Sequence, residues 1–302
     1  MKRSLPVFIV GEARSGSTIL FRTLLNHPAF KPREENLQES SFIIQTPDAY
    51  RFDRNHPRNL QKFLLEDTDE WSRFLESISP LRSWSRLAAI LGPTFAWRWR
   101  LGPTKLVARS YVFHAKRARA SKRLLEKTPN HIYHSDRLLA CFPAARLLYI
   151  HRHPVDVYSS LVRRGQVDPK ADWARIAPDE FCDRYRRHLR LAVRGERRYP
   201  YSVMLVGYHD FTSAPETELE RICDFLGVPY SSNALTALDD PSRWAHWERS
   251  KHLYQGIKTH TKRWQDYISV EVADHVQRNL APEMEYLGYL PYVPEERERL
   301  VH

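Results

Sequence analysis

The sequence predicts an α/β fold in which a central parallel sheet is flanked by helices. Short apolar runs at 5–10, 145–150 and 202–206 indicate buried strands, and a segment with helical apolar spacing follows each of them. Strands that alternate with helices favour a parallel sheet covered on both faces. Ligands of such sheets bind beyond the carboxyl ends of the strands. The loops after Val10 and Ile150 lie at those ends and are therefore the first candidates for function.

Each expected element has its own signal in the sequence. The first apolar run leads into a polar turn at 11–16, and apolar residues at helical spacing follow at 17–26. Pro154 stands in the first turn of an expected helix, and Gly227 and Gly288 stand where the last two helices should end. The remaining expectations are a strand end at 123–126 and helices at 132–141, 154–164, 178–198, 215–226 and 270–286.

Length and composition favour one domain over residues 1–302. The chain is 42% apolar, which is enough for a full core, and it contains no low-complexity linker and no internal repeat. Residues 46–122 are rich in Pro, Trp and Arg and predict loops and several helices without a clear sheet. We expect this segment to be an insertion on the scaffold.

The charge balance indicates anionic partners. A formal net charge of +11 attracts nucleotides, acidic substrates, nucleic acid and anionic membrane surfaces without choosing among them. The basic residues are scattered, with a local peak at 184–198 on an expected long helix. We interpret this peak as a solvated helix face and expect no nucleic-acid partner.

The cysteines and the apolar runs indicate a cytoplasmic protein. Cys141, Cys182 and Cys223 are far apart and form no CxxC pair, which favours free thiols in a reducing compartment over disulfides or a zinc site. The apolar run at 5–10 passes directly into the glycine turn, so we interpret it as a strand and not as a secretory signal. No run approaches the roughly 20 apolar residues that span a bilayer.

Residues 11–18 have the composition of a phosphate-binding loop. Gly11 and Gly16 can adopt backbone angles that other residues resist, so the loop can wrap an oxyanion with its N–H groups. The start of the following helix adds N–H donors and partial positive charge, and the hydroxyls of Ser17 and Thr18 add further donors.

The spacing of this loop is that of a Walker A motif, with Ser17 in place of the expected Lys. A P-loop kinase or ATPase uses that Lys on the β- and γ-phosphates. In addition, the apolar run at 145–150 ends in His-Arg-His and not in a magnesium-binding Asp. The sequence therefore favours phosphate binding over ATP hydrolysis, and a P-loop nucleotide kinase or ATPase is the alternative.

Residues 7–27 resemble the 5′-phosphosulfate loop of the sulfotransferase superfamily. They are most similar to the branch with Arg-Ser-Gly-Thr-Thr loops, which includes the tyrosylprotein sulfotransferases and many bacterial relatives. The resemblance covers 5–45 and 123–290 in order. It implies that 3′-phosphoadenosine 5′-phosphosulfate (PAPS) is the donor, that no metal takes part, and that the loop residues at the donor are Arg14, Ser15, Gly16, Ser17 and Thr18.

A second phosphate site is expected at 151–160. Arg152 ends a strand and Ser160 lies two turns into the next helix, so a guanidinium fork and a hydroxyl can hold one phosphate from two sides. The pair has the spacing of the family's 3′-phosphate motif, whereas Ser159 is one position short. ATP and GTP lack a 3′-phosphate, so the motif favours PAPS. A helix cap with a surface ion pair is the alternative.

The resemblance also implies catalytic residues. Arg14 is the cation at the bridging oxygen, and Lys127 matches the family's Lys-x-Pro element, with a solvated lysine as the alternative. The base should be a carboxylate or His near the loop. Glu35 matches the catalytic Glu of the tyrosylprotein branch, Glu39 matches an element of the glycan-acting branch, and Glu34 is a third candidate. The same glutamates fit a charged helix start.

Two further groups of residues have spacings that resemble binding motifs. Residues 256–264 resemble the late basic loop that closes over the nucleotide, which makes Lys258 and Arg263 candidates for donor binding. His131 and His134 are three residues apart, as metal ligands can be. Without a third ligand we interpret them as surface or capping histidines.

The acceptor must carry a hydroxyl, and a glycan, a lipid, a peptide or a small metabolite are all open. We hypothesise that 46–122 forms the acceptor-side lobe, because variable insertions on a constant scaffold usually determine specificity. Trp and Arg interleave within 84–100, so contact with the acceptor or with a membrane surface stays open beside simple amphipathic packing. A non-catalytic basic nucleotide-binding protein is the third function class.

Overall fold

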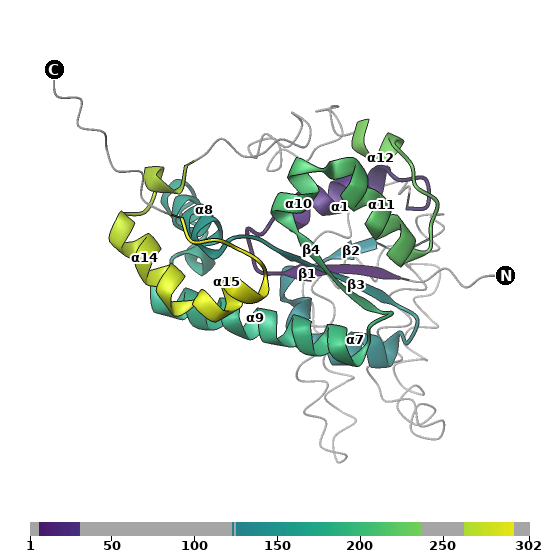
Figure 1. Ribbon diagram of the computed structural model, residues 1–302, viewed down its shortest axis with the longest axis horizontal. Helices are drawn as coiled ribbons and strands as arrows, with labels where there is room; N and C mark the ends of the chain where they lie inside the picture. Colours follow the sequence, from purple (N-terminus) through teal and green to yellow (C-terminus); the bar gives the residue numbers. More distant parts are fainter. Residues whose placement is uncertain (1–5, 31–122, 124, 237–262, 293–302) are drawn as a thin grey trace, which may run out of the picture.

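A four-stranded parallel sheet forms the centre of the molecule. The computed structural model describes residues 6–30, 123, 125–236 and 263–292. Within these ranges the strands are β1 (Val7–Gly11), β2 (Leu125–Lys127), β3 (Arg146–His151) and β4 (Val203–Gly207). They lie in the order β2-β1-β3-β4, and every neighbouring pair is parallel (Figure 1). The predicted α/β fold is confirmed.

Helices cover both faces of this sheet (Figure 1). With η marking a 3-10 helix, the described helices are α1 (Ser17–Asn26), η2 (Pro129–His134), α7 (Ser135–Cys141), α8 (Pro154–Val167), η3 (Asp172–Ala174), α9 (Pro178–Arg198), α10 (Tyr208–Ser213), α11 (Pro215–Leu226), α12 (Asn233–Thr236), η7 (Trp264–Asp266), α14 (Val270–Asn279) and α15 (Ala281–Tyr286). One face carries α1, α10, α11 and α12, and the other carries α7 and α9. Helices α8 and α14 lie beyond the carboxyl ends of the strands.

The strands are apolar throughout because both faces of the sheet are buried. Consecutive residues of a strand point to opposite faces. Ile9 and Ile150 belong to the core cluster shared with α1 and α11, whereas their neighbours Val10 and Tyr149 belong to the cluster shared with α9. All four side chains are at most 1% exposed. Burial on both sides explains why the sequence shows unbroken apolar runs and no alternation.

The parallel register brings four strand ends to one edge of the sheet. Gly11 at the end of β1 lies opposite Ile150, Ile9 lies opposite Lys127 at the end of β2, and His151 lies opposite Gly207 at the end of β4. The residues that follow these ends, far apart in the sequence, are therefore neighbours in space. This edge is where the parallel topology places a ligand.

Two helix predictions are corrected. The helix expected at 270–286 is two helices, α14 and α15, because Pro282 has no N–H to bond to the preceding turn and instead stands at the first turn of α15. The helix expected at 132–141 begins as the 3-10 segment η2, with Pro129 in its first turn, before α7 starts at Ser135. Helices α1, α9 and α11 have the predicted bounds.

Cys182 and Cys223 are buried free thiols, as predicted for these two residues. In the ranges described above, no helix combines the length and the apolar character of a membrane span. The insertion at 46–122 lies outside the described residues. So do the candidates Glu34, Glu35, Glu39 and Lys258.

Candidate functional site

The loop between β1 and α1 requires glycine at two points. Gly11 has a φ of +151° and Gly16 has a φ of +101°, angles that residues with a side chain rarely adopt. A Cβ atom on Gly11 would lie 2.5 Å from the carbonyl oxygen of Ile150, and one on Gly16 would lie 2.2 Å from the ring of Tyr208. Both positions therefore need glycine because of their backbone angle and because of the limited space. A loop whose backbone closely approaches a phosphate needs glycine for the same reasons.

The loop also carries a buried hydroxyl that fits an oxyanion. The Oγ of Ser15 is fully buried and has no hydrogen-bond partner among the described residues. A buried polar group without a partner is costly, so a ligand oxygen here would relieve that cost. Ser17 is buried at the start of α1 and Thr18 is half-buried beside it. The composition and shape of the loop thus fit a bound phosphate.

Arg14 connects the two predicted phosphate sites. Its φ of +75° is left-handed, and Arg14 is the only residue other than glycine with a positive φ in the described ranges. Its Nε donates a hydrogen bond to Oγ of Ser160, two turns into α8, at 3.0 Å. The loop after β1 and the loop after β3 therefore meet at this pair of side chains.

The side chain of Arg152, the first residue after β3, is held in place by Tyr208 and Asp156. Its guanidinium lies over the ring of Tyr208, 4.5 Å from the ring centroid, and its Nη2 is 3.2 Å from Oδ2 of Asp156. The hydroxyl of Tyr292 donates to the same carboxylate oxygen at 3.2 Å. The ion pair that the sequence offered as an alternative is thus present, and it orients the guanidinium.

Tyr208 is a site residue that the sequence analysis did not identify. It follows β4 directly, its side chain is buried, and its ring lies against both Gly16 and Arg152. One ring therefore contacts the phosphate loop and the second loop together. The available signal was its position, since it follows the carboxyl end of an expected strand.

The two neighbouring serines of α8 have different surroundings. Ser160 accepts from Arg14, whereas Ser159 is buried and donates to the carbonyl oxygen of Trp264 in η7, at 3.5 Å. Arg263 directly precedes η7 and is exposed. The predicted serine is thus the one that faces the phosphate loop, and Ser159 ties η7 to α8.

Lys127 is buried, and so are its neighbours. Its side chain is 1% exposed at the end of β2, so its alternative interpretation as a solvated lysine is wrong. Glu126 accepts a hydrogen bond from Oγ1 of Thr128 and lies 3.0 Å from Nδ1 of His131. The interpretation of His131 as a surface or capping histidine is also wrong, because its ring is fully buried. The described residues include no cluster of three potential metal ligands.

Neutral histidines flank Arg152. Burial lowers the pKa of His151 and of His153 to about 4, so both rings are uncharged at neutral pH. Nδ1 of His151 lies 2.7 Å from the hydroxyl of Tyr289, and the ring of His153 stacks on Tyr292 at 4.0 Å between centroids. The His-Arg-His segment therefore presents one positive charge, that of Arg152.

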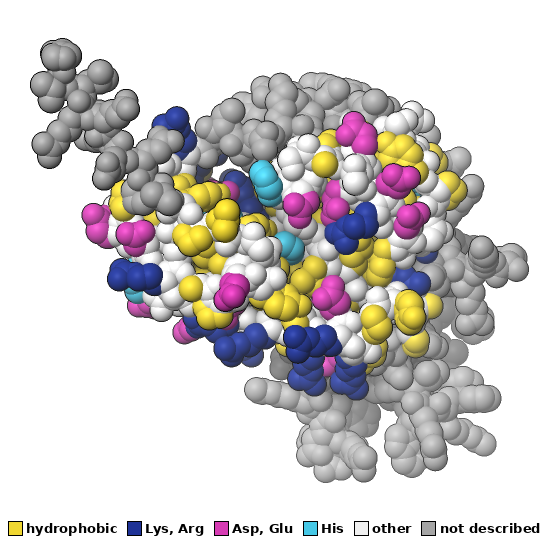
Figure 2. All heavy atoms as spheres, viewed as in Figure 1, with side chains coloured by type: hydrophobic (Ala, Val, Ile, Leu, Met, Phe, Trp, Pro, Cys, Tyr) yellow, Lys and Arg dark blue, Asp and Glu magenta, His cyan; other side chains and the backbone are white. Residues whose placement is uncertain are grey.

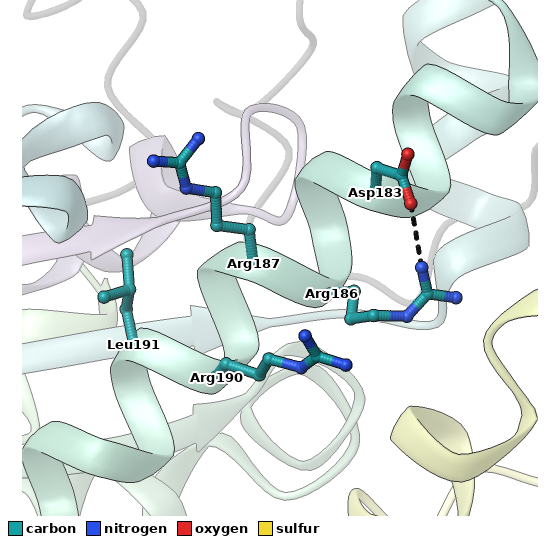
Figure 3. Close-up of a pocket in the computed structure, with 5 residues that line it drawn as sticks. All are labelled: Asp183, Arg186, Arg187, Arg190 and Leu191. Atoms are coloured by element: carbon teal, nitrogen blue, oxygen red, sulfur yellow. Dashed lines mark hydrogen bonds and ion pairs between the residues drawn. The ribbon is translucent and has the colours of Figure 1, made fainter.

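The basic helix α9 is only partly a solvated face, which corrects the sequence interpretation. Arginine side chains gather along it (Figure 2). Arg186 is bound to Asp183, Glu283 and the carbonyl of Asn279, and the guanidinium of Arg187 lies over the ring of Tyr133. These side chains border a hollow of about 610 Å³ lined by Asp183, Arg186, Arg187, Arg190 and Leu191 (Figure 3).

Comparison with known proteins identifies one family. Residues 6–232 match the sequence model of the sulfotransferase family. No curated protein matches the chain significantly in sequence.

Solved structures of similar fold come from the same family. The sulfotransferase domain of the olefin synthase from Synechococcus PCC 7002 is 22% identical, with a TM-score of 0.51 over 96% of this chain and 98% of that one. Sulfotransferase STF9 from Mycobacterium avium is 15% identical, with a TM-score of 0.52 over 96% and 78%. The sulfotransferase domain from the curacin biosynthetic pathway is 18% identical, with a TM-score of 0.52 over 96% and 99%. These likenesses concern the fold.

Proposed function

Since the chain belongs to the sulfotransferase family, we propose that it transfers a sulfo group from PAPS to a hydroxyl group of an acceptor. One observation carries the choice of donor: the 3.0 Å hydrogen bond between Arg14 and Ser160. It joins a loop suited to a 5′-phosphate to a motif suited to a 3′-phosphate. A nucleotide with phosphates at both positions would engage both loops, whereas ATP would engage one.

The 5′-phosphate is proposed to lie in the loop after β1. Gly11 and Gly16 allow the backbone to approach it, and the buried hydroxyl of Ser15 offers a hydrogen bond. The N-terminus of α1 adds the partial charge and the N–H donors that favour an anion. Arg14 supplies a full positive charge beside the loop.

The 3′-phosphate is proposed to lie between Arg152 and Ser160. Asp156 engages Nε and Nη2 of Arg152, which leaves its Nη1 edge as the one open to a phosphate within the described residues. Ser160 already accepts from Arg14, so its hydroxyl proton is available to a phosphate oxygen. The two residues can then hold the phosphate from two sides.

The transfer is proposed to be an in-line displacement. The acceptor oxygen forms a bond to sulfur while the bond from sulfur to the bridging oxygen breaks, and that electron pair stays on the departing adenosine 3′,5′-bisphosphate. The hydroxyl proton passes to a carboxylate base, for which Glu35 is the first choice, before Glu39 and Glu34. Arg14 and the buried Lys127 are proposed to stabilise the negative charge that develops on the bridging oxygen.

Calorimetric titration tests the donor site directly. The intact protein is titrated with adenosine 3′,5′-bisphosphate and with ATP–magnesium, alongside Arg14→Ala and Arg152→Ala. We expect tight binding of the bisphosphate, weak binding of ATP, and at least about a tenfold loss of bisphosphate affinity in each variant, since each removes a charge-assisted phosphate contact.

The matched control for these variants is Arg164→Ala. Arg164 lies in α8 and, like Arg152, forms an ion pair with an aspartate four residues later, Asp168. Its loss should leave bisphosphate affinity unchanged. Preference for ATP–magnesium, with Arg152→Ala as neutral as Arg164→Ala, would instead support the P-loop kinase and exclude the donor proposed here.

A further inference from the structure

A buried acid lies inside the loop that is proposed to bind an anion. Glu12 follows β1 directly, and its side chain is 1% exposed. A buried carboxylate is costly unless it is paired and hydrogen-bonded, and its charge repels a phosphate. Its presence at this point of the loop therefore needs a structural reason.

Glu12 is held from two sides. Its Oε1 accepts from the backbone N–H of the next residue, Ala13, at 3.0 Å. Two nitrogens of Arg184 face its two oxygens: Nη2 lies 2.8 Å from Oε1, and Nε donates to Oε2 at 3.2 Å. Nδ1 of His188, which is fully buried, lies 2.9 Å from Oε2. Arg184 and His188 are one helical turn apart in α9, so the helix presents both to one carboxylate.

These contacts fix the backbone just before Arg14. Besides the Ala13 contact, the carbonyl of Glu12 accepts from the N–H of Ser15 at 3.2 Å, which closes a turn around Arg14. Within this turn Arg14 keeps its left-handed angle and reaches Ser160. A left-handed non-glycine residue persists only where its surroundings enforce it. The contacts of Glu12 with α9 supply such surroundings.

We propose that Glu12, Arg184 and His188 form a clamp that positions the phosphate loop for the 5′-phosphate of the donor. Glu12 is then a positioning residue: it contacts the loop and α9, and it acts on the donor through Arg14. The inference rests on the proposed function, since it assigns the donor's 5′-phosphate to this loop.

The clamp also reaches the segment that follows Lys127. The rings of Tyr133 in η2 and His188 meet edge to face at 4.6 Å between centroids, and the guanidinium of Arg187 lies over the Tyr133 ring, 5.2 Å from its centroid. Burial and the charge of Glu12 raise the pKa of Tyr133, which keeps it neutral and compatible with the carboxylate. One turn of α9 thus supports both the phosphate loop and the start of η2.

The test compares two nucleotides that differ in the 5′-phosphate alone. Adenosine 3′,5′-bisphosphate and adenosine 3′-monophosphate are titrated into the intact protein, and the ratio of their affinities measures what the loop contributes. In Glu12→Gln, which keeps the size and loses the charge, we expect this ratio to fall about tenfold, the difference between charge-assisted and neutral hydrogen bonds. Affinity for the monophosphate should stay unchanged.

Simple repulsion between Glu12 and the donor predicts the opposite change in the affinity ratio. If the charge of Glu12 simply opposes the donor, then Glu12→Gln raises the affinity ratio, and a raised or unchanged ratio would overturn the proposal. Arg184→Lys, which keeps the charge but cannot face both oxygens, should lower the ratio in the same way and gives a second variant should Glu12→Gln fold poorly.

Glu283→Gln is the matched control, because Glu283 is another largely buried carboxylate paired with an arginine of α9, Arg186. The ratio of bisphosphate to monophosphate affinity in Glu283→Gln should equal that of the wild type. A fall in this ratio as large as that of Glu12→Gln would overturn the proposal. Failure of the wild-type protein to bind the bisphosphate would be a different result, since it would remove the donor proposal itself and the clamp's role with it.

Discussion

Gly16→Ala should destabilise the protein and remove tight binding of adenosine 3′,5′-bisphosphate. The φ of Gly16 is +101°, and an added Cβ would lie 2.2 Å from Cδ2 of Tyr208. Left-handed backbone costs roughly 1–2 kcal/mol for a residue with a side chain, and forcing a methyl group into a packed core costs roughly 1–3 kcal/mol. The free energy of unfolding should therefore fall by about 2–5 kcal/mol.

Gly227→Ala separates the two contributions. Gly227 also has a positive φ, +66°, but no atom of the described residues outside its own chain neighbours lies within 4 Å of an added Cβ. The free energy of unfolding of Gly227→Ala should therefore fall only by the cost of the left-handed backbone, about 1–2 kcal/mol. Urea unfolding measures both variants. A second background, Tyr208→Leu, removes the ring, and Gly16→Ala should then cost no more than Gly227→Ala.

The binding arm of this experiment uses calorimetry with the bisphosphate. Gly16→Ala moves the loop or the Tyr208 ring, and that ring also lies over Arg152, so both phosphate sites should be disturbed. Gly227→Ala, at the end of α11, should bind as the wild type does. Equal unfolding losses for the two alanine variants, together with unchanged binding, would refute the close contact between the loop and Tyr208.

Three further predictions follow from single side chains. Ser160→Ala should weaken bisphosphate binding in calorimetry, whereas Ser159→Ala should not, because Ser160 alone faces Arg14. Burial lowers the pKa of His151 and His153 to about 4, so the unfolded chain binds protons at a higher pH than the folded protein does. The free energy of unfolding, measured with urea, should therefore fall as the pH is lowered from 7 towards 4. It should fall less steeply in His151→Gln. Burial raises the pKa of Cys182 to about 12, so a thiol reagent at neutral pH should label it, by peptide mass spectrometry, only after unfolding.

Much of the fold could be predicted because its signals are local. Helix α11 begins at Pro215 and ends at Gly227, whose φ of +66° is the left-handed angle that ends helices, and both residues stand visibly in the sequence. The break between α14 and α15 was missed because the apolar spacing continues across Leu280. Pro282, two residues later, causes the break, and it lies in the first turn of α15, where proline is common.

The site residues that belong to a motif of fixed spacing could be predicted, whereas those that depend on tertiary contacts could not. Arg14, Arg152 and Ser160 were identified because their positions relative to the strand ends repeat a pattern. The partner of Glu12 is Arg184, 172 residues away, and no spacing connects them. In the sequence Arg184 belongs to a run of basic residues that predicts a solvated face, since a run of like charges does not reveal which member meets a buried acid.

The ion pair between Arg152 and Asp156 supports donor binding more than it opposes it. Arg152 precedes the N-cap of α8 and Asp156 lies in the first turn of that helix, and both side chains of the pair are largely buried. A phosphate that bridges Arg152 and Ser160 would bind the Nη1 edge, which Asp156 does not engage, through charge-assisted hydrogen bonds of roughly twice the usual strength. The phosphate therefore does not need to displace Asp156. Meanwhile Asp156, fixed by the hydroxyl of Tyr292, holds the guanidinium against Tyr208 before the donor arrives. The side chain is thus ordered in advance, and binding does not bear the cost of ordering it.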